Sequence, residues 1–189
     1  MKVFFTLLIS FLSIASFAQN LSLSSAAVEL TKQRVTYDPS YFKIDYPNGD
    51  VPATKGVCTD VVIRAYRKLG IDLQKEVHED MKVNFNLYPK IWGLTSTDRN
   101  IDHRRVPNLM KFFERHGTVL PKSQNPEDYK PGDIVTWNLG GAITHIGIVI
   151  DKLSSDGKRP LIVHNIGAGQ VVEDCLFNFT ITGHYSYGN

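Results

Sequence analysis

The stretch KPGDIVTWNLGGAITHIGIVI, residues 130–150, decides the fold class of this chain. Its Pro-Gly and Gly-Gly pairs are typical of turns. The segments after these pairs, residues 133–137 and 144–150, combine β-branched residues with the two-residue period of a β-strand. The stretch therefore predicts two consecutive strands, each entered through a glycine turn.

Three more strands are expected after this stretch. The same β-branched alternation returns at residues 161–166, 171–174 and 180–187, between polar or glycine-rich loops. Together these segments predict an antiparallel sheet in the C-terminal third of the chain.

The sequence before the sheet has helical periodicity. Apolar residues at helical spacing predict a short helix over residues 24–34, an amphipathic helix that starts at Cys58 and stops at Gly70, and another over residues 106–116. Residues 73–105 show little regularity and are expected to be irregular. Helices followed by a sheet indicate an α+β fold.

The first 18 residues have the pattern of a secretory signal peptide, with Lys2, a short apolar run, and small residues at Ser16 and Ala18. The run is shorter than the roughly 20 residues that span a bilayer, and we expect no stable membrane insertion. Gln19 stands where lipid anchoring would need a cysteine. We therefore expect an exported protein, periplasmic or extracellular after signal-peptide removal.

The charge balance argues against two classes of partner. The 21 basic and 19 acidic residues nearly cancel, which leaves no electrostatic footprint for nucleic acid or a membrane surface. We expect residues 19–52 to form an N-terminal helix and an irregular arm, and residues 53–189 to form one catalytic domain. The pattern does not specify an oligomeric state.

Cys58 is placed to act as a nucleophile. The reactive form of cysteine is the thiolate, and a free thiol with a pKa of about 8.5 supplies little of it at neutral pH. Unpaired N–H groups and the partial positive charge at a helix N-terminus lower that pKa. The same N–H groups can stabilise an oxyanion during acyl transfer.

A thiol nucleophile also needs a base, and His145 is the candidate. Strand alternation puts His145 on one face with Gly147 and Val149, whose small size leaves room for the imidazole. A third group usually orients such a base, and the next strand offers His164 and Asn165. The register of the two strands decides between them, because a slip of one residue exchanges the faces.

These residues resemble the NlpC/P60 family of cysteine peptidases. The resemblance covers residues 54–166 and rests on Cys58 heading a helix, the KPGDIV turn and strand, the HIGIV strand from His145, and the IVH strand that ends at His164. It implies a papain-like fold with N-terminal helices packed on a C-terminal antiparallel sheet. It also implies hydrolysis of amide bonds in peptidoglycan stem peptides by Cys58, His145 and His164, without a cofactor.

Longer motifs resemble a bacterial family of unknown function, DUF1287. They are GVCTD (residues 56–60), NIDHRRVPNL (100–109) and HNIG (164–167), and the resemblance spans nearly the whole mature chain. It implies little chemistry. The usual NlpC/P60 nucleophile follows an aspartate, whereas here Val57 precedes the cysteine and Asp60 follows, so Asp60 is counted among the candidate substrate-binding residues.

A charged run, Asp102, His103, Arg104 and Arg105, precedes the helix over residues 106–116. A solvated loop is one interpretation of this run. In the other, Arg104 or Arg105 binds a substrate carboxylate, because a guanidinium matches a carboxylate with two parallel hydrogen bonds. The run and the segment His-Glu-Asp at residues 78–80 lack a recognised metal-binding spacing, so no metal site is expected.

The NlpC/P60 resemblance also implies a tyrosine upstream of the cysteine that supports the oxyanion. Tyr41 and Tyr46, in the expected arm, are the candidates, and both can alternatively be packing aromatics.

Three alternatives remain open at the level of the sequence. Cys58 could pair with Cys175, the other cysteine of the chain, after export. The fold could bind a cell-wall peptide without cleaving it. A thiol hydrolase or acyltransferase of this fold could act on lipid or thioester substrates.

Overall fold

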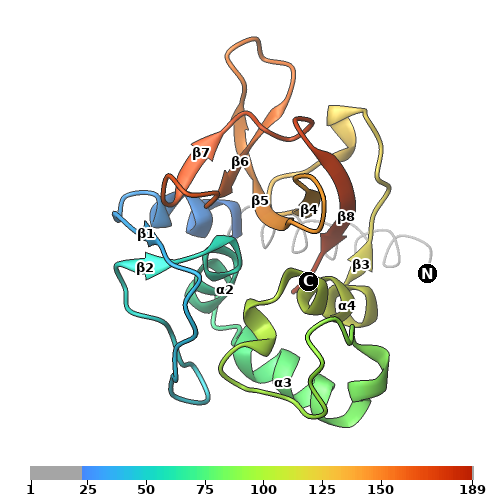
Figure 1. Ribbon diagram of the computed structural model, residues 1–189. Coiled ribbons are helices and arrows are strands. Elements are labelled where there is room, and N and C mark those ends of the chain that lie inside the picture. The colour runs from blue at the N-terminus through green and yellow to red at the C-terminus, as the bar shows by residue number, and fades with distance from the viewer. Residues whose placement is uncertain (1–22, 189) are drawn as a thin grey trace, which may run out of the picture.

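The protein has an α+β fold built on one six-stranded antiparallel sheet (Figure 1). The computed structural model describes residues 23–188, so the expected signal peptide at residues 1–18 lies outside it. The strands, in the spatial order β3-β8-β4-β5-β6-β7, are β3 (Thr118–Val119), β4 (Ile134–Asn138), β5 (Thr144–Leu153), β6 (Pro160–His164), β7 (Val171–Glu173) and β8 (Thr180–Ser186). In the described part of the chain, no helix has the length and apolarity needed to cross a membrane.

The sheet confirms the five expected strands, which are β4 to β8, with ends shifted by a few residues. The two-residue strand β3 was not expected, because so short a segment has no measurable period. It pairs with the end of β8 at the edge of the sheet.

The helices precede the sheet in the chain. They are α2 (Cys58–Lys68), α3 (Leu73–Asn84) and α4 (Val106–His116), with residues 23–30 also helical and short 3-10 turns η1 (Phe85–Leu87), η2 (Asp102–Arg104) and η3 (Pro126–Asp128). The positions predicted for α2 and α4 are confirmed. Gly70 ends α2 with a φ of +80°, a conformation that glycine adopts without strain. The first helix ends at residue 30, four residues before the predicted end.

Helix α3 corrects the expectation that residues 73–105 are irregular. Its buried face consists of Leu73, Val77 and Met81, which recur every four residues. Asp72 caps the helix, because its carboxylate accepts hydrogen bonds from the backbone N–H groups of Gln74 (3.0 Å) and Lys75 (3.3 Å). The polar and charged residues between these apolar positions concealed the period.

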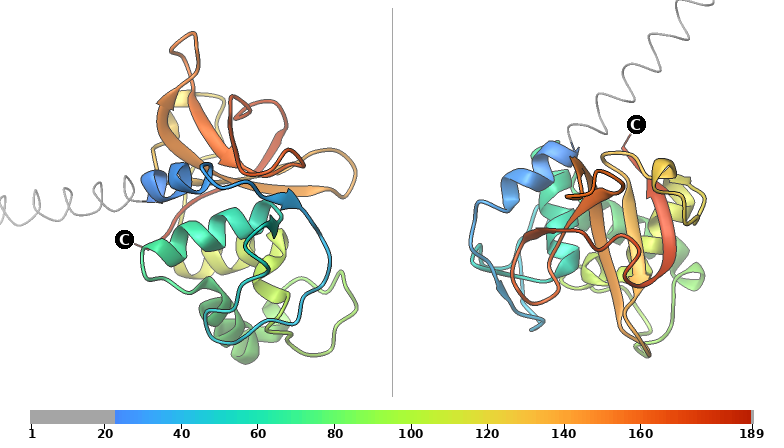
Figure 2. Two further views of the ribbon diagram at one scale, coloured as in Figure 1. Left: turned by 90° about the vertical axis from the view of Figure 1, so that its left-hand side faces the viewer. Right: turned by 90° about the horizontal axis from the view of Figure 1, so that it is seen from above.

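The main core lies between the sheet and the helices, which cover one of its faces (Figure 2). Ile146, Ile148 and Ile150 of β5 point into this core with Val61 and Ala65 of α2. A smaller apolar cluster covers the opposite face, and its buried members are Tyr129, Val135, Trp137, Val149, Ile162, Cys175 and Leu176. Alternation along β5 therefore separates Ile146, on the helix side, from its neighbour His145.

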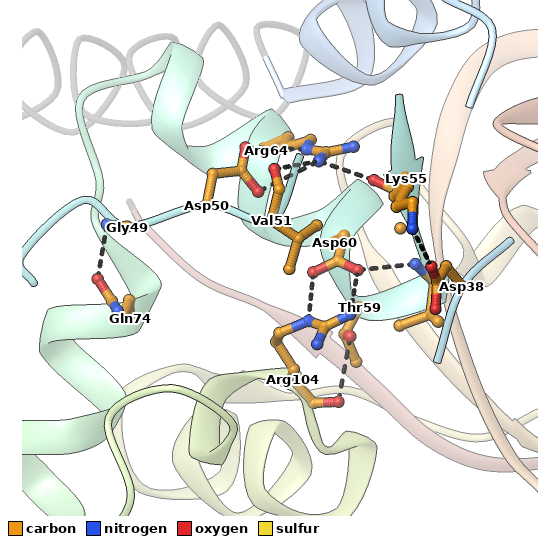
Figure 3. A network of polar contacts seen from close by, with 12 residues as sticks. Asp38, Gly49, Asp50, Val51, Lys55, Thr59, Asp60, Arg64, Gln74 and Arg104 are labelled. Carbon is orange, nitrogen blue, oxygen red and sulfur yellow. Dashed lines mark hydrogen bonds and ion pairs between the residues drawn. The ribbon is translucent and has the colours of Figure 1, made fainter. Parts of the chain in front are cut away.

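The segment before α2 is tied to the rest of the fold. Strand β1 (Thr36–Tyr37) pairs in parallel with β2 (Lys55–Gly56), so part of the expected irregular arm is extended backbone. Asp50 accepts a hydrogen bond from Arg64 of α2 at 3.0 Å (Figure 3). It accepts another from Arg67 of the same helix at 2.8 Å. The pairing of β1 with β2 holds Tyr37 beside the residues that lead into Cys58.

Candidate active site around Cys58 and His145

Cys58 is the first residue of α2, as the sequence predicts. Val57 precedes the helix with an extended backbone, and its N–H donates to the Asp60 carboxylate at 2.7 Å. An acidic residue at this third helical position satisfies a backbone donor that would otherwise lack a partner. Asp60 therefore fixes the turn that presents the thiol.

The Cys58 thiol does not have the lowered pKa that its helix position led us to expect. The side chain is 7% exposed, and this burial, with the nearby charge of Asp60, raises the pKa of the thiol to about 12. The backbone N–H groups of Ile146, Thr59 and Cys58 act in the opposite direction. The effect of burial, which raises the pKa of the thiol, is larger than that of the N–H groups, which lower it. The resting thiol is therefore protonated.

His145, His164 and Glu173 form a chain of hydrogen bonds across three neighbouring strands. His145 Nε2 lies 2.8 Å from His164 Nδ1, and His164 Nε2 lies 2.8 Å from Glu173 Oε2. Both imidazoles are buried, and Glu173 is the partly exposed end of the chain. The sequence analysis did not identify Glu173, because its hydrogen bond to His164 depends on how β6 and β7 pair.

The register of β5 and β6 brings His164 rather than Asn165 to His145. Ile148 pairs with Val163 and Val149 with Ile162, so His164 lies on the same face as His145 and Gly147. A Cβ at Gly147 would meet Ile162 Cγ2 at 2.7 Å, the Val163 carbonyl oxygen at 3.1 Å and His164 Cβ at 3.2 Å, which explains the need for glycine there. Asn165 instead donates to the backbone carbonyl of Gly56 at 3.2 Å.

The chain of hydrogen bonds fixes which nitrogen of His145 carries the proton. Burial lowers the pKa of both imidazoles, so each is neutral and carries one N–H. Because the Glu173 carboxylate only accepts, His164 donates from Nε2 and accepts at Nδ1. His145 must then donate from Nε2, which leaves Nδ1 with a free lone pair.

This lone pair is the basic atom of the group. Within residues 23–188, Nδ1 of His145 makes no hydrogen bond, and it is not among the unpartnered atoms sealed from solvent. Burial, together with His164, lowers the pKa of His145 to about 3. The imidazole therefore stays neutral, with this lone pair unprotonated, over most of the acidic range.

Cys58 and His145 are close in the fold but are not hydrogen-bonded. The backbone N–H of Ile146 lies against the Cys58 thiol, and Thr144 lines the same pocket as Cys58. The His145 ring lies on the other face of β5, 5.8 Å from the Trp137 ring. Among the hydrogen bonds of the described residues, none joins Cys58 to His145, and hydrogen bonds of this kind often form only when substrate is bound.

Cys58 opens into a pocket of about 230 Å³. Its walls come from the N-terminal arm, the start of α2 and the segment before α4, and they include Tyr37, Trp92, Ile101 and Arg105. A larger hollow of about 630 Å³ lies elsewhere, around Asn138 and Phe177, but no thiol, imidazole or carboxylate lines it. The Cys58 thiol therefore belongs to the smaller of these two pockets.

Tyr37 lies at this pocket, whereas the candidates Tyr41 and Tyr46 do not. Tyr37 is opposite Gly56 in the β1–β2 pair, and its burial and the nearby Cys58 raise the pKa of its hydroxyl. Tyr41 donates to Asp98 at 3.0 Å, and Tyr46 packs against His78. Tyr41 and Tyr46 therefore lie outside the Cys58 pocket, where they cannot support the oxyanion. The local sequence does not indicate Tyr37, because its position depends on the parallel pairing of β1 with β2.

Four of the charged candidates are buried, and one of these, Arg104, lines the Cys58 pocket beside Arg105. Asp60 and Arg104 form a buried pair with distances of 2.8 and 3.0 Å (Figure 3). Asp102 and His103 are also buried. Their expected role in substrate binding is not supported for these four residues, because their charged or polar atoms face protein. Arg105 lies at the pocket, with its guanidinium 4.2 Å from the centre of the Trp92 ring.

The two cysteines are separate, and both are free and buried. Cys175 lies 3.7 Å from His164 Nε2, on the far side of that imidazole from His145. Burial and the charges of Glu173 and Asp174 raise the pKa of the Cys175 thiol to about 12. The alternative of a Cys58–Cys175 disulfide is therefore wrong for this structure.

Comparison with known proteins gives a family without an assigned activity. A family described as "Domain of unknown function (DUF1287)" matches residues 24–187. The chain is 52% identical over 168 residues to the uncharacterized protein YijF of Escherichia coli strain K12, covering 89% of this chain and 82% of that protein. No solved structure matches. The family match confirms the resemblance to DUF1287 that the GVCTD, NIDHRRVPNL and HNIG motifs indicated. The extent of the two matches shows that this chain belongs to the DUF1287 family.

Proposed function

We propose that this protein is an exported thiol hydrolase of papain-like fold that cleaves amide bonds in peptidoglycan stem peptides. The observation that carries the proposal is the Glu173–His164–His145 chain of hydrogen bonds, which leaves a free lone pair on His145, the neighbour in β5 of Ile146, whose backbone N–H lies against the Cys58 thiol. A buried imidazole held in one tautomer by a second group is the usual arrangement of a base that activates a nucleophile.

The mechanism follows from the protonation states. At rest the His145 ring lies on the other face of β5 from the thiol, so substrate binding first has to bring the two within reach of each other. As the Cys58 sulfur then attacks the amide carbonyl, its proton passes to His145 Nδ1 and an S–C bond forms. The backbone N–H groups at the start of α2, with Tyr37 beside them, stabilise the oxyanion. His145 then protonates the leaving amine as the C–N bond breaks, and water hydrolyses the thioester to regenerate the thiol.

Arg105 supports an anionic peptide as the substrate. Its guanidinium stacks on Trp92 at the pocket that contains Cys58, whereas Arg104 is already paired with Asp60. Stem peptides carry free carboxylates, and stacking holds the guanidinium in one plane for a two-pronged contact with such a group. The choice of cell-wall peptide among anionic peptides rests on the NlpC/P60 resemblance, and export rests on the pattern of residues 1–18.

The proposal is tested by digestion of purified peptidoglycan fragments. The wild-type protein is expected to release peptides with a new free amine, detected by mass spectrometry, and Cys58→Ala is expected to release none. Thermal unfolding of both proteins checks that the substitution spares the fold. Equal release by Cys58→Ala would contradict the assignment of the nucleophile, and no release by either protein would contradict the reaction.

A second candidate is a module that binds cell-wall peptide without cleaving it. The raised pKa of Cys58 and the missing Cys58–His145 hydrogen bond favour this candidate. Titration calorimetry with the same fragments separates the two functions. Saturable binding by wild-type protein that leaves the fragments intact after long incubation would support the binding module.

A further inference from the structure

The β6–β7 hairpin brings three metal-binding side chains together behind His145. They are His164, Glu173 and Cys175, whose ligand atoms all lie within 4.8 Å of one another. His164 Nε2 is 2.8 Å from Glu173 Oε2 and 3.7 Å from Cys175 Sγ. No other group of three potential ligands with this spacing occurs within residues 23–188.

The pairing of the hairpin explains this cluster. His164 is opposite Val171, and strand alternation brings Glu173 to the same side as Val171. Cys175 follows two residues after the end of β7, and its sulfur also approaches His164. Trp137 donates from its indole N–H to the Leu176 carbonyl at 2.9 Å, which anchors the chain next to Cys175. The buried His164 and Cys175 are therefore held in place, whereas Glu173 is partly exposed and adjustable.

The ligand set suits zinc. An imidazole nitrogen, a thiolate and a carboxylate are its common protein ligands, and a fourth position can hold water. With usual bond lengths, the nitrogen and oxygen ligands of a tetrahedral site lie about 3.4 Å apart, so the 2.8 Å distance between His164 and Glu173 has to widen by about 0.6 Å. The adjacent Asp174, held by Arg159 at 2.6 and 3.0 Å, adds negative charge.

We propose that His164, Glu173 and Cys175 form a zinc site whose occupation reverses the proton positions of the His145–His164 pair. On binding, the Cys175 thiol gives its proton to solvent and a zinc–sulfur bond forms. Zinc takes the Nε2 lone pair of His164, so the one remaining N–H of this neutral imidazole is at Nδ1. That N–H now donates to His145 Nε2, which forces the proton of His145 onto Nδ1.

The consequence is a base that zinc switches off. A protonated Nδ1 of a neutral His145 has no lone pair with which to accept the Cys58 proton. This consequence rests on the proposed function. The metal site and the change of tautomer do not, because they depend only on the contacts of His164.

Cobalt binding to two single-cysteine variants tests the site. Since the chain has two cysteines, Cys58→Ala leaves Cys175 alone and Cys175→Ser leaves Cys58 alone. Cys58→Ala is expected to show a thiolate-to-cobalt charge-transfer band that one equivalent of zinc abolishes. Cys175→Ser is expected to show no such band. A band in Cys175→Ser with none in Cys58→Ala would overturn the proposal, as would its absence from both.

Nitrogen NMR of the imidazoles tests the switch without any substrate. In Cys58→Ala, zinc is expected to move the N–H of His145 from Nε2 to Nδ1. When Glu173→Gln is added to Cys58→Ala, the cobalt concentration needed for the charge-transfer band is expected to rise at least about tenfold, the lower end of what loss of a supporting group costs in metal affinity. An unchanged N–H at Nε2 under saturating zinc would disprove the switch. If peptidoglycan cleavage fails but zinc still moves the proton, the proposed function is wrong and the zinc site stands.

Discussion

Cys58 is subject to two opposing effects that act on the pKa of one thiol. The start of α2 favours the thiolate, whereas burial favours the thiol, and burial dominates. The pair at rest is therefore a neutral thiol beside a neutral imidazole. Attack then requires that the proton leave during the step itself, which makes the tautomer of His145 decisive for catalysis.

In the proposed mechanism Glu173 is a positioning residue, and its replacement tests the chain of hydrogen bonds. The amide group introduced by Glu173→Gln can donate to His164 Nε2, which allows the tautomers of both imidazoles to reverse. Glu173→Gln is expected to lower kcat by roughly 10- to 100-fold, as for other groups that orient a functional imidazole, and to leave KM unchanged. Steady-state kinetics on a soluble stem peptide measure both constants. Glu173→Asp should recover part of kcat, and a change confined to KM would argue against this role.

Arg105 is expected to act on binding rather than on the chemical step. A charge-assisted hydrogen bond contributes about 1.5–3 kcal/mol, so Arg105→Gln should raise KM by roughly 10- to 100-fold with little change in kcat. The matched control is Arg99→Gln, since the Arg99 guanidinium lies over Tyr46, away from the Cys58 pocket. Equal effects of both substitutions would contradict the assignment of Arg105.

Individual residues of the site were predictable to different degrees. Cys58 and His145 stand out locally, because a helix start and a strand with small neighbours are visible in a few residues. The choice of His164 over Asn165 needed the β5–β6 register. Tyr37 and Glu173 needed pairings between segments that the sequence does not specify.

At the scale of elements, the buried Asp60–Arg104 pair joins α2 to η2 next to the pocket. Removing one member leaves a buried charge without its partner, which costs roughly 3–5 kcal/mol. Arg104→Met is therefore expected to lower the free energy of unfolding by about this amount in urea titrations. Adding Asp60→Asn to Arg104→Met should recover a large part of the lost stability, because Asp60→Asn removes the buried charge that Arg104→Met leaves unpaired.

The exposed pair Lys32–Glu29 provides the matched control. Lys32→Met should change the free energy of unfolding by less than about 1 kcal/mol, as for other pairs at the surface. If Arg104→Met costs no more than Lys32→Met, the buried pair does not fasten η2 to α2.

The elements show where periodicity suffices. Helices α2 and α4 and strands β4 to β8 have strong periods and clear glycine ends, and they lie where the sequence placed them. Helix α3 was missed, because its apolar stripe of three residues is too narrow to stand out among charged neighbours, although Asp72 marks its start. Strands β1, β2 and β3 have two residues each and exist only through their partners.

At the scale of the whole molecule, buried histidines make stability depend on pH. Burial and the charge of Arg104 lower the pKa of His103 to about 3, while an unfolded histidine titrates near about 6.5. Between these values the unfolded state binds the proton and the folded state does not, so stability falls as pH decreases. Asp102 opposes this trend, because burial raises the pKa of its carboxyl to about 6, but His145 adds to it.

His103→Gln is expected to flatten this pH dependence. One proton bound only by the unfolded state contributes about 1.4 kcal/mol per pH unit to the slope, and the substitution removes it between about pH 6 and about pH 4. Urea titrations at several pH values measure the slope. Above about pH 7 the slope should be unchanged, and an unaltered slope below about pH 6 would contradict the account of His103.

The whole account depends on His145 acting as the base for Cys58. Alkylation of Cys58 at neutral pH by a stem peptide that carries a chloromethyl ketone, followed by mass spectrometry of the fragment that contains Cys58, measures this with the pocket occupied. His145→Gln is expected to slow the reaction about a hundredfold, the lower end of what a positioned base contributes, whereas both proteins unfolded in urea should react equally. Equal rates for the two folded proteins would contradict the account.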